Sequence, residues 1–189
     1  MLSKNQLKLI TSLQQKKYRN KHGLFIAEGI KVVNELLNSN FDCEFLFHTE
    51  DFLVDHRVKN VVITENELKK ISTLKTPNKA VGLFRIPKPR SFEDQGLIVA
   101  LDGVNDPGNL GTIIRLCDWF GVEQLVCSKN TVDCYNQKVV QSSMGSLSRV
   151  SIFYQDLNLV LNETALPVYG AVMNGKNVHQ EIREPHHGV

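Results

Sequence analysis

Hydrophobic positions alternate between helical and strand spacing along the first part of the chain. Apolar residues near one helical face predict a helix over 2–15, with Ser3 as its N-cap. Segment 16–21 is polar and predicts a turn or a short second helix. The remaining apolar runs predict strands at 25–27, 41–47, 61–64 and 80–85, and helices at 28–37 and 65–71. This alternation predicts a small α/β domain over residues 1–86.

A stiff connection follows this domain. Pro87-Lys88-Pro89-Arg90 places two prolines two positions apart among basic neighbours, which favours an extended backbone. We therefore expect a linker over 87–95 and a second domain over 96–189.

The second domain opens on the continuous apolar run 97–101, which is typical of a strand buried on both faces of a parallel sheet. A helix over 111–120 and a strand over 122–127 would complete a right-handed βαβ unit. The pattern then predicts helices at 136–142 and 156–163, and strands at 150–154 and 166–172. The expected fold class is α/β with a parallel sheet in the second domain.

Composition agrees with a globular protein that has a real core. The chain has 189 residues, of which 42% are hydrophobic and 22% charged. We expect no signal peptide, because no apolar stretch follows Lys4 and Lys8, and no apolar run approaches the roughly 18–20 residues that a membrane helix needs. Its four cysteines form no CxxC pair and have no neighbouring histidines, so we expect reduced thiols in a cytoplasmic protein without a metal. They are Cys43, Cys117, Cys127 and Cys134.

Positive charge gathers at the start of the chain, although the net charge is only +2. Six basic residues precede Glu28, the first acidic residue. They create a field that could attract phosphate, and the alternative is an exposed, solvated helix face.

The most informative stretch runs from Leu101 to Arg115 and reads LDGVNDPGNLGTIIR. It follows a strand and opens a helix, which is where ligands of open α/β sheets bind. Gly108, Gly111 and Pro107 favour a tight loop, and the helix N-terminus suits an anion. Neither GxGxxG nor a Gly-Lys-Ser/Thr phosphate loop is present, so a nucleotide-binding dehydrogenase is disfavoured.

Arg115 lies about one turn into that helix, near the mouth of the loop. Helical spacing places Arg115, Asp118 and Trp119 on one side, so Arg115 could simply pair with Asp118. Trp119 could stack on a base, cover the edge of the sheet or contact a dimer partner. The opposite, buried face is expected to hold Ile113, Leu116, Cys117 and Phe120.

The ordered set DPGNLGT at 106–112, followed by Arg115 and Phe120-Gly121, resembles the first signature motif of the SpoU (TrmH-like) RNA 2′-O-methyltransferases. Residues 136–146 resemble the next segment of that family. Residues 25–29, FIAEG, resemble the start of its N-terminal substrate-binding domain. The resemblance implies an α/β-knot (SPOUT) methyltransferase domain behind an RNA-binding domain.

The resemblance also implies an activity, namely S-adenosylmethionine-dependent methylation of a ribose 2′-hydroxyl in structured RNA. Ribosomal RNA is the first candidate and transfer RNA the second; a non-catalytic RNA-binding protein that kept the fold is the alternative. Arg115 is the family's motif arginine, and Asn109 helps to shape the ribose site. An arginine is a poor proton acceptor because its pKa exceeds about 12, so we expect Arg115 to stabilise a developing alkoxide.

Family members are homodimers, so the resemblance implies a homodimer for the full-length protein. The clustered positive charge of the basic segment, with Tyr18 as a stacking candidate, predicts the RNA contacts. The expected RNA-binding residues are Lys16, Lys17, Tyr18, Arg19 and Lys21. The first cofactor loop of the family corresponds to Val172, Met173, Asn174 and Gly175. An ordinary turn with positive φ angles at Asn174-Gly175 is the alternative for this loop.

Two later family motifs, which complete the knot and most of the donor pocket, do not occur before Val189. We therefore expect a truncated chain with an incomplete knot. Taken alone, it should bind S-adenosylmethionine weakly or not at all and be inactive.

Overall fold

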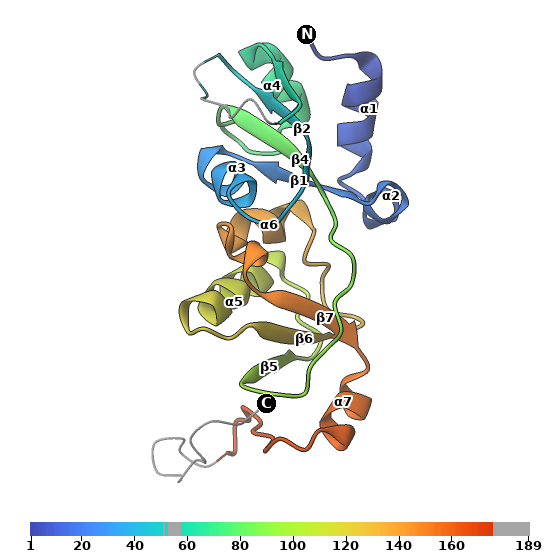
Figure 1. Ribbon diagram of the computed structural model, residues 1–189, viewed down its shortest axis with the longest axis vertical. Coiled ribbons are helices and arrows are strands. Elements are labelled where there is room, and N and C mark those ends of the chain that lie inside the picture. Colours follow the sequence, from blue (N-terminus) through green and yellow to red (C-terminus); the bar gives the residue numbers. More distant parts are fainter. Residues whose placement is uncertain (51, 53–57, 176–189) are drawn as a thin grey trace.

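A computed structural model describes residues 1–50, 52 and 58–175 of the chain. The last part of the expected second domain, 176–189, lies outside these residues. Figure 1 shows two sheets stacked along the long axis, with the N-terminus at one end. The helices are α1 (Lys4–Ser12), α2 (Lys16–His22), α3 (Ile30–Leu37), α4 (Glu65–Ile71), α5 (Pro107–Trp119), α6 (Gln137–Ser143), the 3-10 turn η1 (Ser146–Ser148) and α7 (Leu157–Glu163). The strands are β1 (Leu24–Glu28), β2 (Cys43–His48), β3 (Asn60–Val62), β4 (Ala80–Arg85), β5 (Ile98–Leu101), β6 (Gln124–Ser128) and β7 (Ser151–Gln155).

The first sheet has the strand order β1-β4-β2-β3. Its β1–β4 and β4–β2 pairs are antiparallel, and its β2–β3 pair is parallel. Side chains of β1 alternate between two cores, because successive residues of a strand point to opposite faces. Ile26 packs with α1 and α4 on one face, whereas Phe25 packs with α3 on the other. Both faces of this sheet are therefore covered by helices.

Capping side chains fix the ends of the helices on one face of this sheet. The Ser3 hydroxyl accepts a hydrogen bond from the Gln6 backbone N–H, and the Gln6 side-chain oxygen accepts one from the Ser3 backbone N–H. This capping box confirms the expected N-cap. Thr64 and Glu67 form the same capping box on α4. Gly23, at φ +63°, ends α2 in the left-handed conformation and turns the chain directly into β1.

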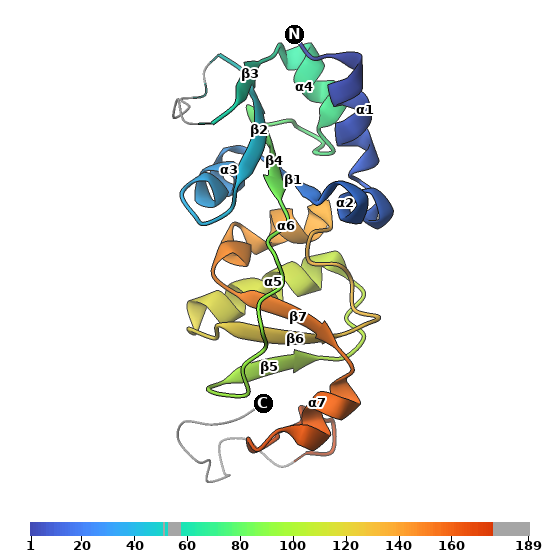
Figure 2. The same cartoon turned by 45° about the vertical axis from the view of Figure 1, so that its right-hand side comes forward.

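The second sheet is parallel, with the order β5-β6-β7. Helices α5 and α6 cover the face that looks toward the first sheet, and α7 covers the opposite face (Figure 2). Strand β6 is buried on both faces, since Leu125 packs against α5 and Val126 against Val160 of α7. The expected parallel α/β arrangement of this region is confirmed.

The two sheets share a continuous core. Helix α6 packs beneath β1, and the ring of Tyr135 lies 4.9 Å from the ring of Phe25, centroid to centroid. One cluster of buried side chains runs from Leu36 of α3 through Val139 of α6 to Leu125 of β6. Among the helices of the described ranges, none is both long and apolar enough to cross a membrane.

Two expectations about helix α5 were wrong. Helix α5 begins at Pro107 rather than residue 111, because Asp106 caps it and a proline fits the first helical position. The buried face of α5 contains Ile114 and Cys117, whereas Leu116 and Phe120 are exposed.

The strand expected at 166–172 is also absent from the described residues. The segment is irregular, and from Pro167 onward it is exposed. Only Leu166 reaches the core around α7. A run of apolar residues without a neighbouring strand or a face to bury gains little from an extended ladder, and Pro167 lacks the N–H that such a ladder uses.

Candidate active site

The loop after β5 is held in place by backbone hydrogen bonds. The Gly103 N–H donates to the Ser128 hydroxyl at 2.8 Å, and the Val132 N–H donates to the Val104 carbonyl at 2.9 Å. The Asp106 carboxylate then accepts from the Asn109 N–H at 2.8 Å and starts α5. The loop is thus fixed between the carboxyl end of β6 and the first turn of α5, at the edge where ligands of parallel sheets bind.

The motif predicted that Gly111 lies in a ligand-binding loop. It lies inside α5 instead. A Cβ atom here would lie 2.4 Å from the Ser142 Cβ and 2.9 Å from the Val139 carbonyl oxygen, both on α6. No real Cβ tolerates such contacts, so the glycine lets α5 and α6 approach closely. The second motif segment, 136–146, contains α6, the helix that packs against Gly111.

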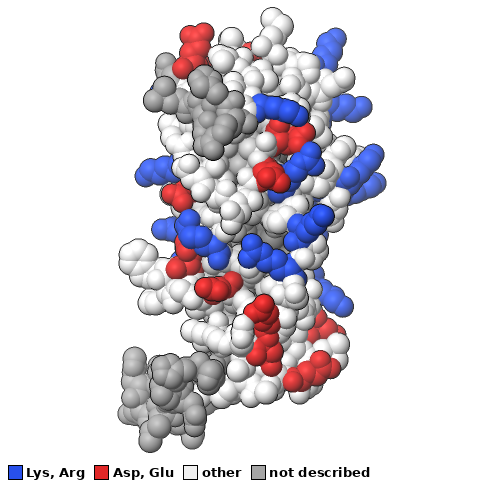
Figure 3. Space-filling model, viewed as in Figure 1, with Lys and Arg blue, Asp and Glu red and all other residues white. Residues whose placement is uncertain are grey.

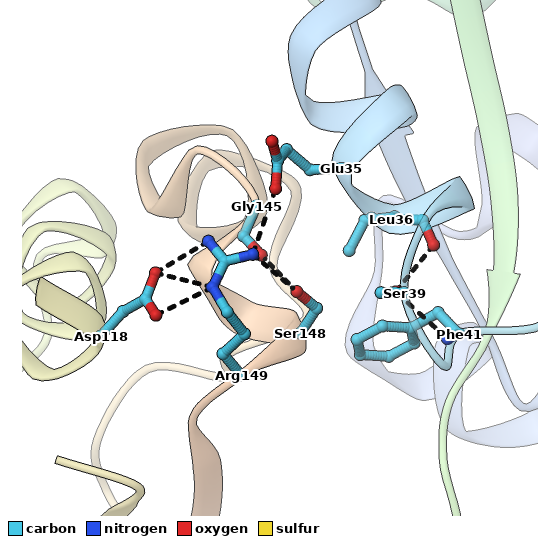
Figure 4. A network of polar contacts seen from close by, with 8 residues as sticks. All are labelled: Glu35, Leu36, Ser39, Phe41, Asp118, Gly145, Ser148 and Arg149. Carbon is cyan, nitrogen blue, oxygen red and sulfur yellow. Dashed lines mark hydrogen bonds and ion pairs between the residues drawn. The ribbon is translucent and has the colours of Figure 1, made fainter. Parts of the chain in front are cut away.

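Arg115 is exposed and has no hydrogen bond or ion pair with the rest of the described chain. The pairing with Asp118 that helical spacing allowed does not form. Instead, Arg149 donates to the Asp118 carboxylate from Nε and Nη2, both at 2.8 Å (Figure 4). Arg149 also donates from Nη1 to Glu35 of α3 at 3.1 Å. The motif arginine is therefore left available for a ligand.

Arg149 sets the electrostatics beside the motif helix. Its guanidinium holds the pKa of the Asp118 carboxyl below the ordinary value, and the two carboxylates in turn raise the pKa of Arg149. Sequence reasoning missed this residue because its partners are 31 and 114 residues away along the chain.

Asn109 is exposed on the first turn of α5. Arg115 follows it by six positions, so the two lie about 9 Å apart along the helix axis and about 120° apart around it. The structure therefore does not bring the two side chains to one point on this helix. The role of Asn109 in shaping a ribose site stays a prediction.

The basic segment forms α2 and presents most of its charges outward. Lys16, Lys17 and Lys21 are exposed, and the Lys17 ammonium lies 5.9 Å from the centre of the Tyr18 ring. On the face drawn in Figure 3, lysine and arginine side chains gather on the side that carries α1 and α2 and across the middle of the molecule. Their RNA contacts stay a prediction.

Arg19 departs from this expectation. Its side chain is only 3% exposed, and its Nη2 lies 2.6 Å from the Asp133 carboxylate of the second region. Its Nη1 donates to the carbonyls of Leu13 and Gln14 at 3.0 and 2.9 Å. This guanidinium is bound inside the protein and is not presented to RNA.

The segment expected to contact a cofactor is open to solvent. Val172 is 69% exposed and Met173 fully so. A turn is present, because the Gly175 N–H donates to the Val172 carbonyl at 3.2 Å, but neither Asn174 nor Gly175 has a positive φ. By themselves these four residues do not enclose a ligand.

The cysteines carry no reactive thiolate. Desolvation raises the pKa of the partly buried Cys43 thiol and of the buried Cys127 thiol to about 12, and Cys117 and Cys134 are buried. Within the part of the chain that the structure describes, no three His, Cys, Asp or Glu side chains are grouped to hold a metal ion.

Two family models match separate parts of the chain. A family model described as the MRM3-like substrate binding domain matches residues 4–82, and one described as the SpoU rRNA Methylase family matches residues 96–188. A solved TrmH-family structure from Porphyromonas gingivalis is 35% identical, with a TM-score of 0.87, over 97% of this chain and 76% of that one. The chain belongs to the SpoU rRNA methylase family.

Other SpoU relatives have named activities. The 23S rRNA (guanosine(2553)-2′-O)-methyltransferase RlmP of Bacillus subtilis is 28% identical over 95% of this chain and 75% of its own length. An AdoMet-bound rRNA methyltransferase structure from Sinorhizobium meliloti is 27% identical, with a TM-score of 0.75, over 89% of this chain and 70% of that one. The mitochondrial rRNA methyltransferase 3 of Xenopus laevis is a longer protein. It is 29% identical over 77% of this chain, and the matched part covers 38% of its length.

Proposed function

We propose that this SpoU chain carries the ribose-recognising part of an S-adenosylmethionine-dependent RNA 2′-O-methyltransferase that acts on ribosomal RNA. The observation that carries the proposal is the state of Arg115. It is exposed and unpaired about two turns into α5, rather than the one turn expected, while Arg149 occupies the nearby Asp118. The RNA and ribose named for the Bacillus relative support the choice of substrate.

Arg115 would act as an electrostatic catalyst. S-adenosylmethionine supplies a methyl group on a sulfonium leaving group, so alignment and charge stabilisation can provide most of the catalysis. Arg115 would stabilise the negative charge that develops on the ribose 2′-oxygen and hold the adjacent phosphate. Residues 172–175 do not fit an enclosed donor site as they stand, so we assign them no step.

The test is Arg115→Ala in the enzyme as it occurs in the cell. We expect 2′-O-methylation, mapped by mass spectrometry of ribosomal RNA, to fall by a factor of about 100 or more, as for loss of one stabiliser of a transition-state charge. RNA affinity should change much less. Arg115→Lys should recover only part of the activity, because lysine lacks the planar fork of donors.

The control is Lys69→Ala, which removes an exposed cation from α4, on the face of the first sheet that packs with α1 and away from α5. Its methylation should equal that of the unaltered enzyme. Methylation that survives Arg115→Ala would refute the catalytic role. RNA binding without methylation in the unaltered enzyme would favour the non-catalytic alternative instead.

We also propose that the protein acts as a homodimer that uses the outer face of α5. Leu116, Trp119 and Phe120 are 50%, 84% and 73% exposed and share one side of the helix end. Large apolar side chains gathered in this way are typical of an interface. Trp119→Glu should shift the enzyme to a monomer in analytical ultracentrifugation, whereas Thr112→Glu, on the exposed first half of α5, should not. A dimer that persists in Trp119→Glu would place the interface elsewhere.

A further inference from the structure

A cavity of about 440 Å³ lies between β7 and the connection that follows β4. Residues 86–90 form one wall and residues 151–155 the other, with Phe41 and Tyr135 also lining the space. Figures 1 and 2 both show this connection running from β4 past β7 to β5. The volume falls in the range of about 300–1,000 Å³ that is usual for small-ligand sites. Neither Arg115 nor Asn109 lines this cavity.

The wall of the cavity combines aromatic rings with positive charge. Its lining includes Lys88, Arg90 and Arg149 but no aspartate or glutamate. Arg149 is already bound to two carboxylates, but Lys88 and Arg90 are exposed and make no ion pair with other described residues. The cavity therefore favours an anionic ligand that also has a flat apolar part.

Strand β7 adds hydrogen-bonding capacity to this wall. It pairs only with β6, so its outer edge has no neighbouring strand among the described residues. Backbone N–H and C=O groups on such an edge are free to bond a ligand. The lining side chains of Asn40, Ser151 and Gln155 offer further donors and acceptors.

Tyr154 is held in place at the centre of this surface. Its hydroxyl donates to the Val132 carbonyl and accepts from the Cys134 N–H, both at 2.7 Å. The Lys16 ammonium of α2 lies 5.8 Å from the centre of the Tyr154 ring. One basic side chain of α2 therefore lies beside an aromatic ring of the cavity wall.

We propose that this cavity binds an unpaired nucleotide of the RNA. The base would lie against the aromatic rings, and Lys88, Arg90 and Lys16 would hold the flanking phosphates. An extended peptide could also add to the edge of β7, but it would not need a basic wall without a single carboxylate. The inference rests on the proposed function in taking RNA as the substrate, and it adds a second contact away from the methylated ribose.

The probe is a short single-stranded oligouridine that carries 4-thiouridine. Irradiation should crosslink it to the cavity wall, at Tyr135, Tyr154 or the 86–90 segment, as mapped by mass spectrometry. Loss of two phosphate contacts in Lys88→Ala/Arg90→Ala should lower the affinity about tenfold at moderate salt, and should lower the slope of log affinity against log salt by about 1.4.

The matched control is Lys69→Ala/Lys70→Ala, which removes the same charge from the exposed end of α4. It should bind the oligonucleotide as the unaltered protein does. Crosslinks confined to other surfaces, or equal effects of the two double variants, would overturn the proposal. An apolar peptide in the cavity, bound with little dependence on salt, would do the same.

Methylation of ribosomal RNA separates this inference from the proposed function. Crosslinks outside the cavity with methylation retained would reject the nucleotide site alone. Crosslinks in the cavity without methylation would reject the enzymatic activity alone.

Discussion

The guanidinium of Arg19 is almost fully buried, and it donates four hydrogen bonds. Two of them go to Asp133, which is itself only 13% exposed in its side chain. A buried ion pair of this kind is costly to break, because removal of one partner leaves the other charge without compensation. Arg19 therefore contributes to the attachment of α2 to the second region.

Arg19→Ala should lower the free energy of unfolding by about 3 kcal/mol, since Asp133 would keep a buried, unpaired charge. Urea unfolding followed by circular dichroism measures the change. Lys17→Ala, an exposed position on the same helix, should stay within about 0.5 kcal/mol of the unaltered protein. Equal stabilities of the two variants would show that the ion pair contributes nothing.

The basic segment also shows what sequence can say about single residues. Charge and helical spacing predicted that 16–21 would be basic and exposed, and this holds for Lys16, Lys17 and Lys21. Neither property distinguishes Arg19, because its partner is 114 residues away. For the same reason the sequence left open whether Arg115 pairs with Asp118, and only the position of Arg149 answered that question.

At the scale of elements, helix α5 contains most of the motif and packs it against α6. Its start was predictable in principle, since Asp106 followed by Pro107 is a common helix opening. The two glycines of the motif favoured a loop instead, so the predicted helix began at residue 111, four residues after its observed start. The role of Gly111 depends on α6, which local sequence could not place against it.

Gly111→Ala should destabilise the protein by about 2 kcal/mol, because the added methyl group would force α5 and α6 apart. The intrinsic helix propensity of alanine, about 1 kcal/mol better than that of glycine, would act in the opposite direction. Thermal and urea unfolding measure the net effect. Thr112→Ala, the next and exposed position, provides the comparison and should be nearly neutral. A gain in stability for Gly111→Ala would contradict the close approach of the helices.

At the scale of the whole molecule, contacts of α6 and its surroundings join the two sheets. Gln137 of α6 donates to the buried Glu28 of β1, which Ser72 and Thr73 also hold. Arg149 links Asp118 of α5 to Glu35 of α3 (Figure 4). These contacts orient the N-terminal region relative to the helix that carries Arg115.

The Asp118–Arg149 contact should contribute a pH-dependent stability. The folded state lowers the Asp118 pKa below its ordinary value of 3.8, so the contribution is complete above that pH and is lost as the pH falls through the lowered pKa. Both side chains are partly exposed, so the size should stay below about 1 kcal/mol.

Thermal unfolding of the unaltered protein and of Asp118→Asn, compared from neutral pH to below pH 3, measures this contribution. The difference should be constant near neutrality and shrink in acid. Glu35→Gln, used as a common background, removes the second carboxylate from the comparison. A difference that grows as the pH falls would contradict the assigned ion pair.

The sequence by itself determined the order of nearly all elements, the parallel second sheet and the family motif, because local hydrophobic spacing and capping residues encode them. It did not determine the segment 166–172, where an apolar run without a partner strand stays irregular. Only the tertiary structure decided which charges are buried, which arginine meets Asp118, and that a basic cavity lies beside β7. Each of these depends on residues that are distant along the chain and adjacent only after the two sheets pack.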